Sequence, residues 1–344
     1  MGDMTTWQAD LYALPVNDQL GVLSSTKFVV EQGKHVWINP QQVEALSKAW
    51  IQDQTLQVAI PTAPGQWFTD YHFFDGTERT VNWMLVLDAL NFCFWAEKGQ
   101  ARWTMHYRGE SLNGYWAEAA SLKRAVEEGI PLWDATYLSN ISCETVAHIF
   151  RGTQTIPLLE QRAAHLQEVG RVLLENFSGQ FAHAIEQTAG SAVQLVHLLV
   201  HYFSSFRDVT HYQQREIRFF KRAQICVADL YGAFGGQQWG KFTDIDQLTA
   251  FADYKLPQVL RHCKVIVYNS TLAEQVDNQQ LLACGSDEEI EIRAVTIWAC
   301  ELLRRAMHRR GCDMTVAEID QRLWLLGQQA EKMLPYHRTL TIYY

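Results

Sequence analysis

The sequence predicts a mostly α-helical fold with a few short strands. Long segments carry apolar residues at helical spacing, and only 8 Pro and 20 Gly are spread over the 344 residues. Strand-like segments are short and few. Hydrophobic residues make up 48% of the chain and include 12 Trp, 13 Tyr and 16 Phe, which is enough to bury a large core.

Helical periodicity predicts helices through the first two thirds of the chain. These segments are 41–51, 80–97, 112–129, 157–177 and 191–206. The best candidate for a membrane span is 83–96, but its 14 residues include Asp88 and Asn91. A membrane-spanning helix needs about 20 apolar residues, so we interpret this segment as a buried helix.

Capping signals predict the last two long helices. In segment 286–311, Ser286 and Glu289 form a capping box, acidic residues fill the first turn and arginines fill the last. Thr315 with Glu318 repeats the capping box at the start of the next helix. Cap and charge both match the helix dipole, so these two helices are the most firmly predicted.

Strands and turns account for the rest of the predicted elements. The strand-like segments are 35–38, 102–107 and 339–344, and the turn-rich segments are 61–65, 75–77 and 232–241. No segment has the composition of a linker. We therefore expect a single domain over residues 1–344, or two tightly fused helical lobes.

The charge balance limits the classes of partner. A formal net charge of −9 argues against a surface that grips long nucleic acid, because neutralising phosphates requires a basic face. One small phosphate in a local basic pocket remains compatible with it. The 7 cysteines are scattered without CxxC spacing, which indicates reduced thiols. Without a recognisable signal peptide, a cytoplasmic protein is expected.

Several motif-like stretches are better explained structurally. His197 and His201 have the i, i+4 spacing of metal ligands, but Leu198 stands where the zincin motif has Glu, so we interpret them as core or boundary histidines. The stretch GGQQWGK (235–241) lacks the GxxxxGK[ST] pattern of a phosphate loop and is expected to be a turn. No metal site is predicted.

Acidic residues among apolar neighbours are the strongest chemical signal. They are Asp88, Asp229, Asp253 and Asp320. A buried carboxylate costs several kcal/mol unless it is hydrogen-bonded, so each one needs a partner. Most such residues cap a helix or hold a backbone amide, and we interpret Asp88 and Asn91 as structural. Asp253, in the stretch FADYKLPQVLR, either caps the helix that follows or performs chemistry.

A pair of cations follows two aromatic residues in the stretch FFKRAQ (219–224). Lys221 and Arg222 lie side by side at the start of a predicted helix. One of them can bind a phosphate group, and the other can face solvent. The spacing alone does not decide between the two.

Five blocks together resemble a known family. They are LDALNFCFW (87–95), FFKRAQICVADL (219–230), LTAFADYKLPQVLR (248–261), IDQRLW (319–324) and YHRTLTIYY (336–344). In this order they are similar to the queuosine salvage proteins, which are queuosine 5′-phosphate N-glycosylases/hydrolases. The resemblance implies a helical fold similar in part to helix-hairpin-helix DNA glycosylases. It also implies hydrolysis of the N-glycosidic bond of queuosine 5′-monophosphate, which releases queuine for tRNA modification, without a cofactor.

The resemblance also implies the residues of the site. Cleavage of the C1′–N bond builds positive charge on the ribose, which a carboxylate in a dry site stabilises, and Asp253 matches the acid of the family's FADY block. The expected contacts to the base come from Phe251, Asp320 and His72, and those to the phosphate and ribose from Lys221, Tyr343 and Tyr344.

Two other functions remain open at this point. The chain could be a non-catalytic nucleotide- or tRNA-binding protein on the same helical scaffold, although its negative charge argues against tRNA. A DNA glycosylase would need a basic groove and a helix-hairpin-helix glycine pattern, which GGQQWGK matches poorly. The expected partner is therefore a small molecule, with no membrane and no obligate protein partner.

Overall fold

The computed structural model describes residues 11–52, 70–329 and 333–344, and it divides the chain into two compact units. Unit 1 is built from the described parts of Met1–Ala59, Val209–Lys221 and Asp246–Leu340. Unit 2 is built from those of Ile60–Asp208, Arg222–Ile245 and Thr341–Tyr344. The turn predicted at 61–65 lies outside the described residues. A single domain, or two fused lobes, stays a prediction.

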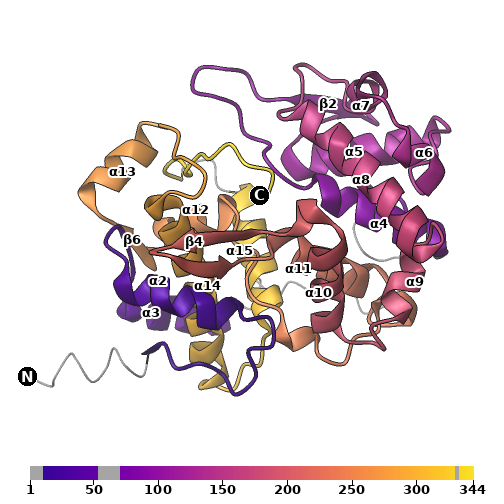
Figure 1. Ribbon diagram of the computed structural model, residues 1–344. Helices are drawn as coiled ribbons and strands as arrows, with labels where there is room; N and C mark the ends of the chain where they lie inside the picture. The colour runs from indigo at the N-terminus through magenta and orange to yellow at the C-terminus, as the bar shows by residue number, and fades with distance from the viewer. Residues whose placement is uncertain (1–10, 53–69, 330–332) are drawn as a thin grey trace, which may run out of the picture. The chain divides into compact units, whose positions relative to one another are not determined.

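Unit 1 is helical with two small antiparallel sheets (Figure 1). Its helices are α2 (Val22–Gln32), α3 (Pro40–Gln52), α12 (Lys255–His262), α13 (Ser270–Asp277), α14 (Asp287–His308) and α15 (Val316–Gln329). The sheets pair β1 (Val36–Ile38) with β6 (Ile266–Tyr268), and β4 (Val209–Tyr212) with β5 (Arg215–Arg218). The short 3-10 helix η4 (Ile245–Gln247) crosses from unit 2 into unit 1.

Helix α14 forms the centre of unit 1. It is buried over most of its length and packs against α2, α3, α12, α15 and β1. Its residue Glu291 accepts hydrogen bonds from the backbone N–H groups of Lys34, His35 and Val36 and from the Tyr212 hydroxyl. One buried carboxylate thus joins α14 to the start of β1 and to β4. Such multiple bonding offsets the cost of burying its charge.

The predicted caps of the last two helices are confirmed, with one change of partner. Ser286 Oγ accepts from the Glu289 N–H at 3.3 Å. The Glu289 carboxylate, however, accepts from the Gly285 N–H, whereas a capping box would have it accept from the Ser286 N–H. Thr315 and Glu318 form both bonds of the capping box. The mostly helical class is confirmed, and the likeness to helix-hairpin-helix glycosylases stays a prediction.

Unit 2 is also helical and carries one hairpin. Its helices are α4 (Glu78–Leu90), α5 (Gly114–Glu127), α6 (Ala135–Ser139), α7 (Cys143–Ile149), α8 (Leu159–Phe177), α9 (Phe181–Glu186), α10 (Ala192–Tyr202) and α11 (Lys221–Ala233), whose first residue is assigned to unit 1. Two 3-10 helices, η2 (Ser204–Phe206) and η3 (Gln238–Gly240), and the hairpin of β2 (Thr104–Tyr107) with β3 (Glu110–Asn113) complete it.

The helix predicted at 80–97 is shorter at its C-terminal end than expected. Helix α4 ends at Leu90, and its C-terminal carbonyl groups are bound by two buried arginines from elsewhere in unit 2. Arg162 donates to the carbonyls of Leu90, Phe92 and Cys93, and Arg222 donates to those of Asp88 and Ala89. Guanidinium donors satisfy the carbonyls that the next helical turn would have bonded, so the chain turns away.

The strand predicted at 339–344 is wrong. Among the described residues, the only ladder contact near it is an isolated parallel bridge between Leu281 and Arg338 in unit 1. In unit 2, the Tyr344 carbonyl accepts from the Cys93 N–H at 3.0 Å, and the Tyr344 side chain is buried. The tail is therefore held by contacts other than a sheet.

The candidate membrane span also has a structural explanation. Segment 83–96 lies partly in α4, which is buried over most of its length within unit 2, and Asp88 is buried with it. Across the described residues, no helix combines the length and apolarity required to cross a bilayer.

Arg162 lies on α8, which also carries a matched control. Arg162→Met should lower the free energy of unfolding by roughly 3–5 kcal/mol, because three buried carbonyls lose their donor and the nearby buried Glu118 loses a cation. Arg171→Met removes only an exposed pair with Glu175 and should cost less than about 1 kcal/mol. Urea unfolding measures both values, and equal losses would contradict this role of Arg162.

Candidate active site

Asp253 lies in the loop that leads into α12, and it binds the start of that helix. Its Oδ1 accepts hydrogen bonds from the backbone N–H groups of Lys255 at 2.7 Å and Leu256 at 2.9 Å. The capping interpretation of Asp253 is therefore confirmed. Among the described residues both of these bonds end on Oδ1, and neither occupies Oδ2. Capping and chemistry are compatible, because the cap fixes the direction in which Oδ2 points.

Asp320 holds the same loop from a different helix. It lies on α15 with 5% of its surface exposed, and its Oδ2 accepts a hydrogen bond from the Phe251 N–H at 2.7 Å. Burial raises the pKa of Asp320 well above its usual value, and the negative charge of Asp253 raises it further. The two aspartates, 67 positions apart in the sequence, are thus electrostatically coupled within unit 1.

The carboxyl group of Asp253 has a raised pKa for the same main reason. Desolvation raises it, and the ammonium of Lys221, the two amide hydrogen bonds and Lys255 oppose that rise. The residue keeps some exposed surface, yet protein surrounds the carboxyl group closely enough for desolvation to dominate. Two carboxyl groups that interact in this way titrate as a pair, in which Asp253 ionises before Asp320.

Lys221 supplies a positive charge that acts on both Asp253 and Asp320. It is the first residue of α11 and is only 3% exposed. Its positive charge limits the rise in the pKa of both aspartates. The neighbouring Arg222 does not face solvent: it is buried in unit 2, where it binds backbone carbonyls. Of the two adjacent cations, Lys221 is therefore the one at the acidic pair, and Arg222 is structural.

Phe251 completes the set that the structure brings together in unit 1. Its side chain is partly exposed, and its backbone N–H is bound by Asp320. Four of the predicted site residues, Lys221, Phe251, Asp253 and Asp320, therefore meet in one unit through hydrogen bonds and charge coupling.

The other three predicted residues belong to unit 2. His72 is buried against the rings of Trp83 and Trp116, with Nε2 at 2.8 Å from the Tyr115 hydroxyl. Tyr344 is buried and Tyr343 is partly exposed. Their roles toward the base and the phosphate stay predictions.

The sequence interpretation missed one residue next to the segment 251–253, which carries Asp253 and is called the acidic loop below. Arg293 of α14 is buried and donates a hydrogen bond from Nε to the Ala252 carbonyl at 3.1 Å. Its signal in the sequence is a lone arginine within the apolar stretch IEIRAVTIWA (290–299), a pattern that by itself predicts only a helix.

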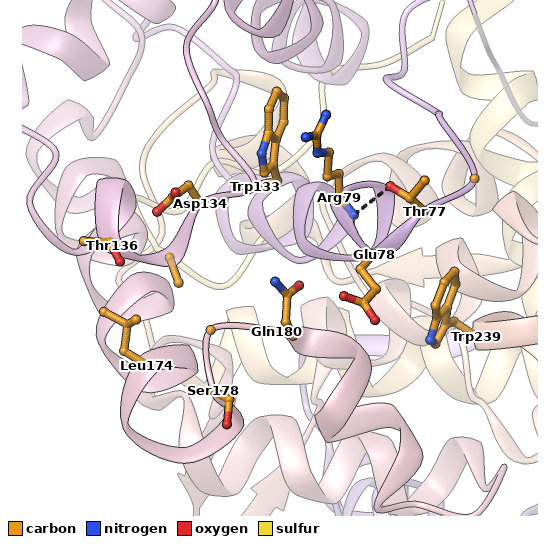
Figure 2. A pocket seen from close by; sticks show the side chains of 13 residues that line it. Thr77, Glu78, Arg79, Trp133, Asp134, Thr136, Leu174, Ser178, Gln180 and Trp239 are labelled. Atoms are coloured by element: carbon orange, nitrogen blue, oxygen red, sulfur yellow. Dashed lines mark hydrogen bonds between the residues drawn. The ribbon is translucent and has the colours of Figure 1, made fainter.

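A separate cavity of about 840 Å³ lies in unit 2. Figure 2 shows Arg79 and Trp133 on one side of it and Trp239 on another; the Arg79 guanidinium lies 5.0 Å from the centre of the Trp133 ring. None of the predicted site residues lines this cavity. The carboxyl groups of Asp253 and Asp320 therefore do not line it.

Comparison with known proteins agrees with the pattern of the five blocks. A family model described as queuosine salvage protein matches residues 71–344, a range that contains every predicted site residue. The chain belongs to this family. The resemblance inferred from the sequence is confirmed.

Curated relatives support the same assignment across most of the chain. All three of the following are named queuosine 5′-phosphate N-glycosylase/hydrolase. The relative from Sphaerobacter thermophilus is 48% identical over 328 residues, which cover 95% of this chain and 98% of its own. The relative from Bos taurus is 35% identical (93% and 97% covered), and that from Nematostella vectensis is 38% identical (80% and 85% covered).

The raised pKa of Asp320 predicts a pH-dependent stability. The folded state keeps the Asp320 proton to a higher pH than the unfolded chain does, so the free energy of unfolding falls as the pH rises from about 4 through the raised value. Asp320→Asn removes this titration and still accepts from the Phe251 N–H. Wild type should therefore lose stability relative to the variant, by up to about 1.4 kcal/mol per pH unit.

Urea unfolding of both proteins at steps from about pH 5 to about pH 8 measures this difference. A difference that stays constant over the whole range would show that Asp320 titrates like an ordinary aspartate.

Proposed function

We propose that this protein hydrolyses the N-glycosidic bond of queuosine 5′-phosphate and releases queuine for reuse in tRNA modification. Water supplies the hydroxyl group that replaces the base on C1′ and the proton that the departing base gains, so the products are ribose 5-phosphate and queuine. The observation that carries the proposal is the coupled group of Asp253, Asp320 and Lys221 in a chain of the queuosine salvage family. No cofactor is needed for this reaction.

Asp253 is proposed as the catalytic residue. As the C1′–N bond breaks, positive charge grows on the ribose, and an anion fixed beside it stabilises that charge strongly where water is excluded. Two helix amides bind Oδ1, which keeps the carboxylate in place and leaves Oδ2 for C1′ or for the attacking water. Lys221 favours the ionised form that this role requires.

Asp320 is proposed to bind the departing base. Queuine is a 7-deazapurine with carbon at position 7, so protonation at that position does not assist departure. A carboxyl group that keeps its proton can donate one hydrogen bond and accept others. Since Oδ2 of Asp320 accepts from Phe251, we assign the contact with the base edge to Oδ1, with the Phe251 ring stacked on the base. His72 is a further proposed contact to the base.

Lys221 has two candidate tasks that the structure makes separable. It is proposed to bind the 5′-phosphate, together with Tyr343 or Tyr344, and it also keeps Asp253 ionised. Because the pKa of Asp320 is raised well above its usual value, its carboxyl group competes less for the ammonium, and part of that charge remains for the phosphate.

Asp253→Asn separates charge from capping. Asn still accepts the two amide hydrogen bonds at the start of α12 but carries no charge, so the variant should fold normally and release base roughly 10³-fold more slowly. Incubation with queuosine 5′-monophosphate, followed by chromatography of free queuine, measures the rate. The control is Asp246→Asn, which changes an exposed acid shortly before the same loop.

Turnover by Asp253→Asn close to that of Asp246→Asn would remove Asp253 from the mechanism. Binding of the nucleotide by wild type without any release of base would favour the non-catalytic alternative.

Lys221→Met tests the phosphate role. If Lys221 binds the phosphate, KM should rise at least about tenfold for queuosine 5′-monophosphate and much less for the unphosphorylated nucleoside. Steady-state kinetics on both substrates measures this ratio. An equal loss on both substrates would mean that Lys221 acts only through Asp253.

A further inference from the structure

Arg293 makes three contacts that converge behind the acidic loop. It is only 2% exposed, and its Nε donates to the Ala252 carbonyl at 3.1 Å. Its guanidinium carbon lies 3.9 Å from the centre of the Phe219 ring, and its Nη1 lies 3.6 Å from a carboxylate oxygen of Glu289. All of these residues belong to unit 1.

These contacts join the two segments that carry the site. Ala252 stands between Phe251 and Asp253, and Phe219 stands two positions before Lys221. One guanidinium group therefore touches the segment of the carboxylate and the segment of the ammonium. A shift of this side chain would change the distance between the two charges.

The acidic loop is held residue by residue from three helices. Phe251 is bound through its N–H by Asp320 of α15, Ala252 through its carbonyl by Arg293 of α14, and Asp253 through its carboxylate by the first amides of α12. The contact with Arg293 also reaches Phe219. Removal of Arg293 thus frees the middle of the loop while both neighbours keep their bonds.

Arg293 is itself fixed in one orientation. Glu289, one turn earlier on α14, balances its charge, and the Glu289 carboxylate is held by the Gly285 N–H at 3.1 Å. A planar guanidinium can donate in its plane and stack on a ring with its face at the same time. Lysine has a point charge and no plane, so it cannot make both contacts in this geometry.

We propose that Arg293 is a positioning residue, which fixes Asp253 relative to Lys221 and is required for bond cleavage rather than for substrate binding. This inference rests on the proposed function. Arg293 makes none of its three converging contacts with either carboxyl group of the pair. It acts through the Ala252 carbonyl and the Phe219 ring.

The test compares Arg293→Met and Arg293→Lys with Arg304→Met in the full chain. Arg304 lies on the same helix but is partly exposed and pairs with Glu301, so its loss leaves the loop untouched. Displacement of a catalytic group by about 1 Å costs roughly 100-fold, so both Arg293 variants should lose about 100-fold in kcat, with KM changed less than about threefold. Arg304→Met should match wild type.

Two further readouts separate positioning from a general loss of stability. Methylguanidine should restore part of the kcat of an Arg293→Ala variant, because it can refill the space and bind the Ala252 carbonyl. Amide hydrogen exchange should quicken at residues 251–256 in Arg293→Lys and not in Arg304→Met. This exchange arm needs no turnover, so it decides the matter even if Arg293→Met fails to fold.

Each outcome decides something different. Wild type that releases no queuine overturns the proposed function, and the exchange arm still tests whether Arg293 holds the loop. Wild type that turns over, with kcat of Arg293→Lys within about twofold of it and unchanged exchange, overturns the positioning role. A rise in KM at constant kcat would also overturn it, since that result describes a binding residue.

Discussion

Two carboxyl groups and one ammonium group share a buried part of unit 1, and the rest of the site depends on this imbalance of charge. Burial raises the pKa of both Asp253 and Asp320, and Lys221 opposes the rise at both. Lys255 opposes it at Asp253 alone, whereas the negative charge of Asp253 adds to the rise at Asp320. Unequal environments thus give two chemically identical side chains different pKa shifts.

The scaffold stabilises this arrangement with backbone groups. Helix α12 presents its first amides to Asp253, where the helix dipole also favours an anion. The Phe251 N–H donates a hydrogen bond to Asp320. Arg293 binds the carbonyl of Ala252, which lies between Phe251 and Asp253 in the chain. Asp253 therefore caps α12 through Oδ1, and the chemistry proposed for it uses the other carboxylate oxygen.

The sequence predicted correctly those elements that are determined by interactions between residues close in the chain. The helix α14 and the start of α15 were found from capping boxes and dipole-matched charges, which act within one turn. The end of α4 was missed, because Arg162, more than 70 positions away, binds the carbonyls of Leu90 and Phe92. The strand expected at 339–344 failed for a similar reason, since its backbone bonds go to distant single partners such as Cys93.

The residues of the site also differ in whether the sequence alone indicates them. Asp253 and Lys221 were found from unusual neighbours and from family resemblance, but no spacing in the sequence indicates that Asp253 and Asp320 are coupled. Arg293 was missed because, at i, i+4 from Glu289, it has the pattern of an ordinary helical ion pair. Only the fold reveals that it also binds a carbonyl 41 positions away.

Carbon-13 NMR of aspartate carboxyl groups tests the coupling of Asp253 and Asp320 most directly, with Asp253→Asn and Asp320→Asn used to assign the two signals. Both signals should titrate above the usual aspartate range, Asp320 after Asp253, and Asp253→Asn should lower the pKa of Asp320 because a like charge is removed. An Asp320 signal that titrates near the ordinary pKa of about 4, unaffected by Asp253→Asn, would contradict the coupled pair.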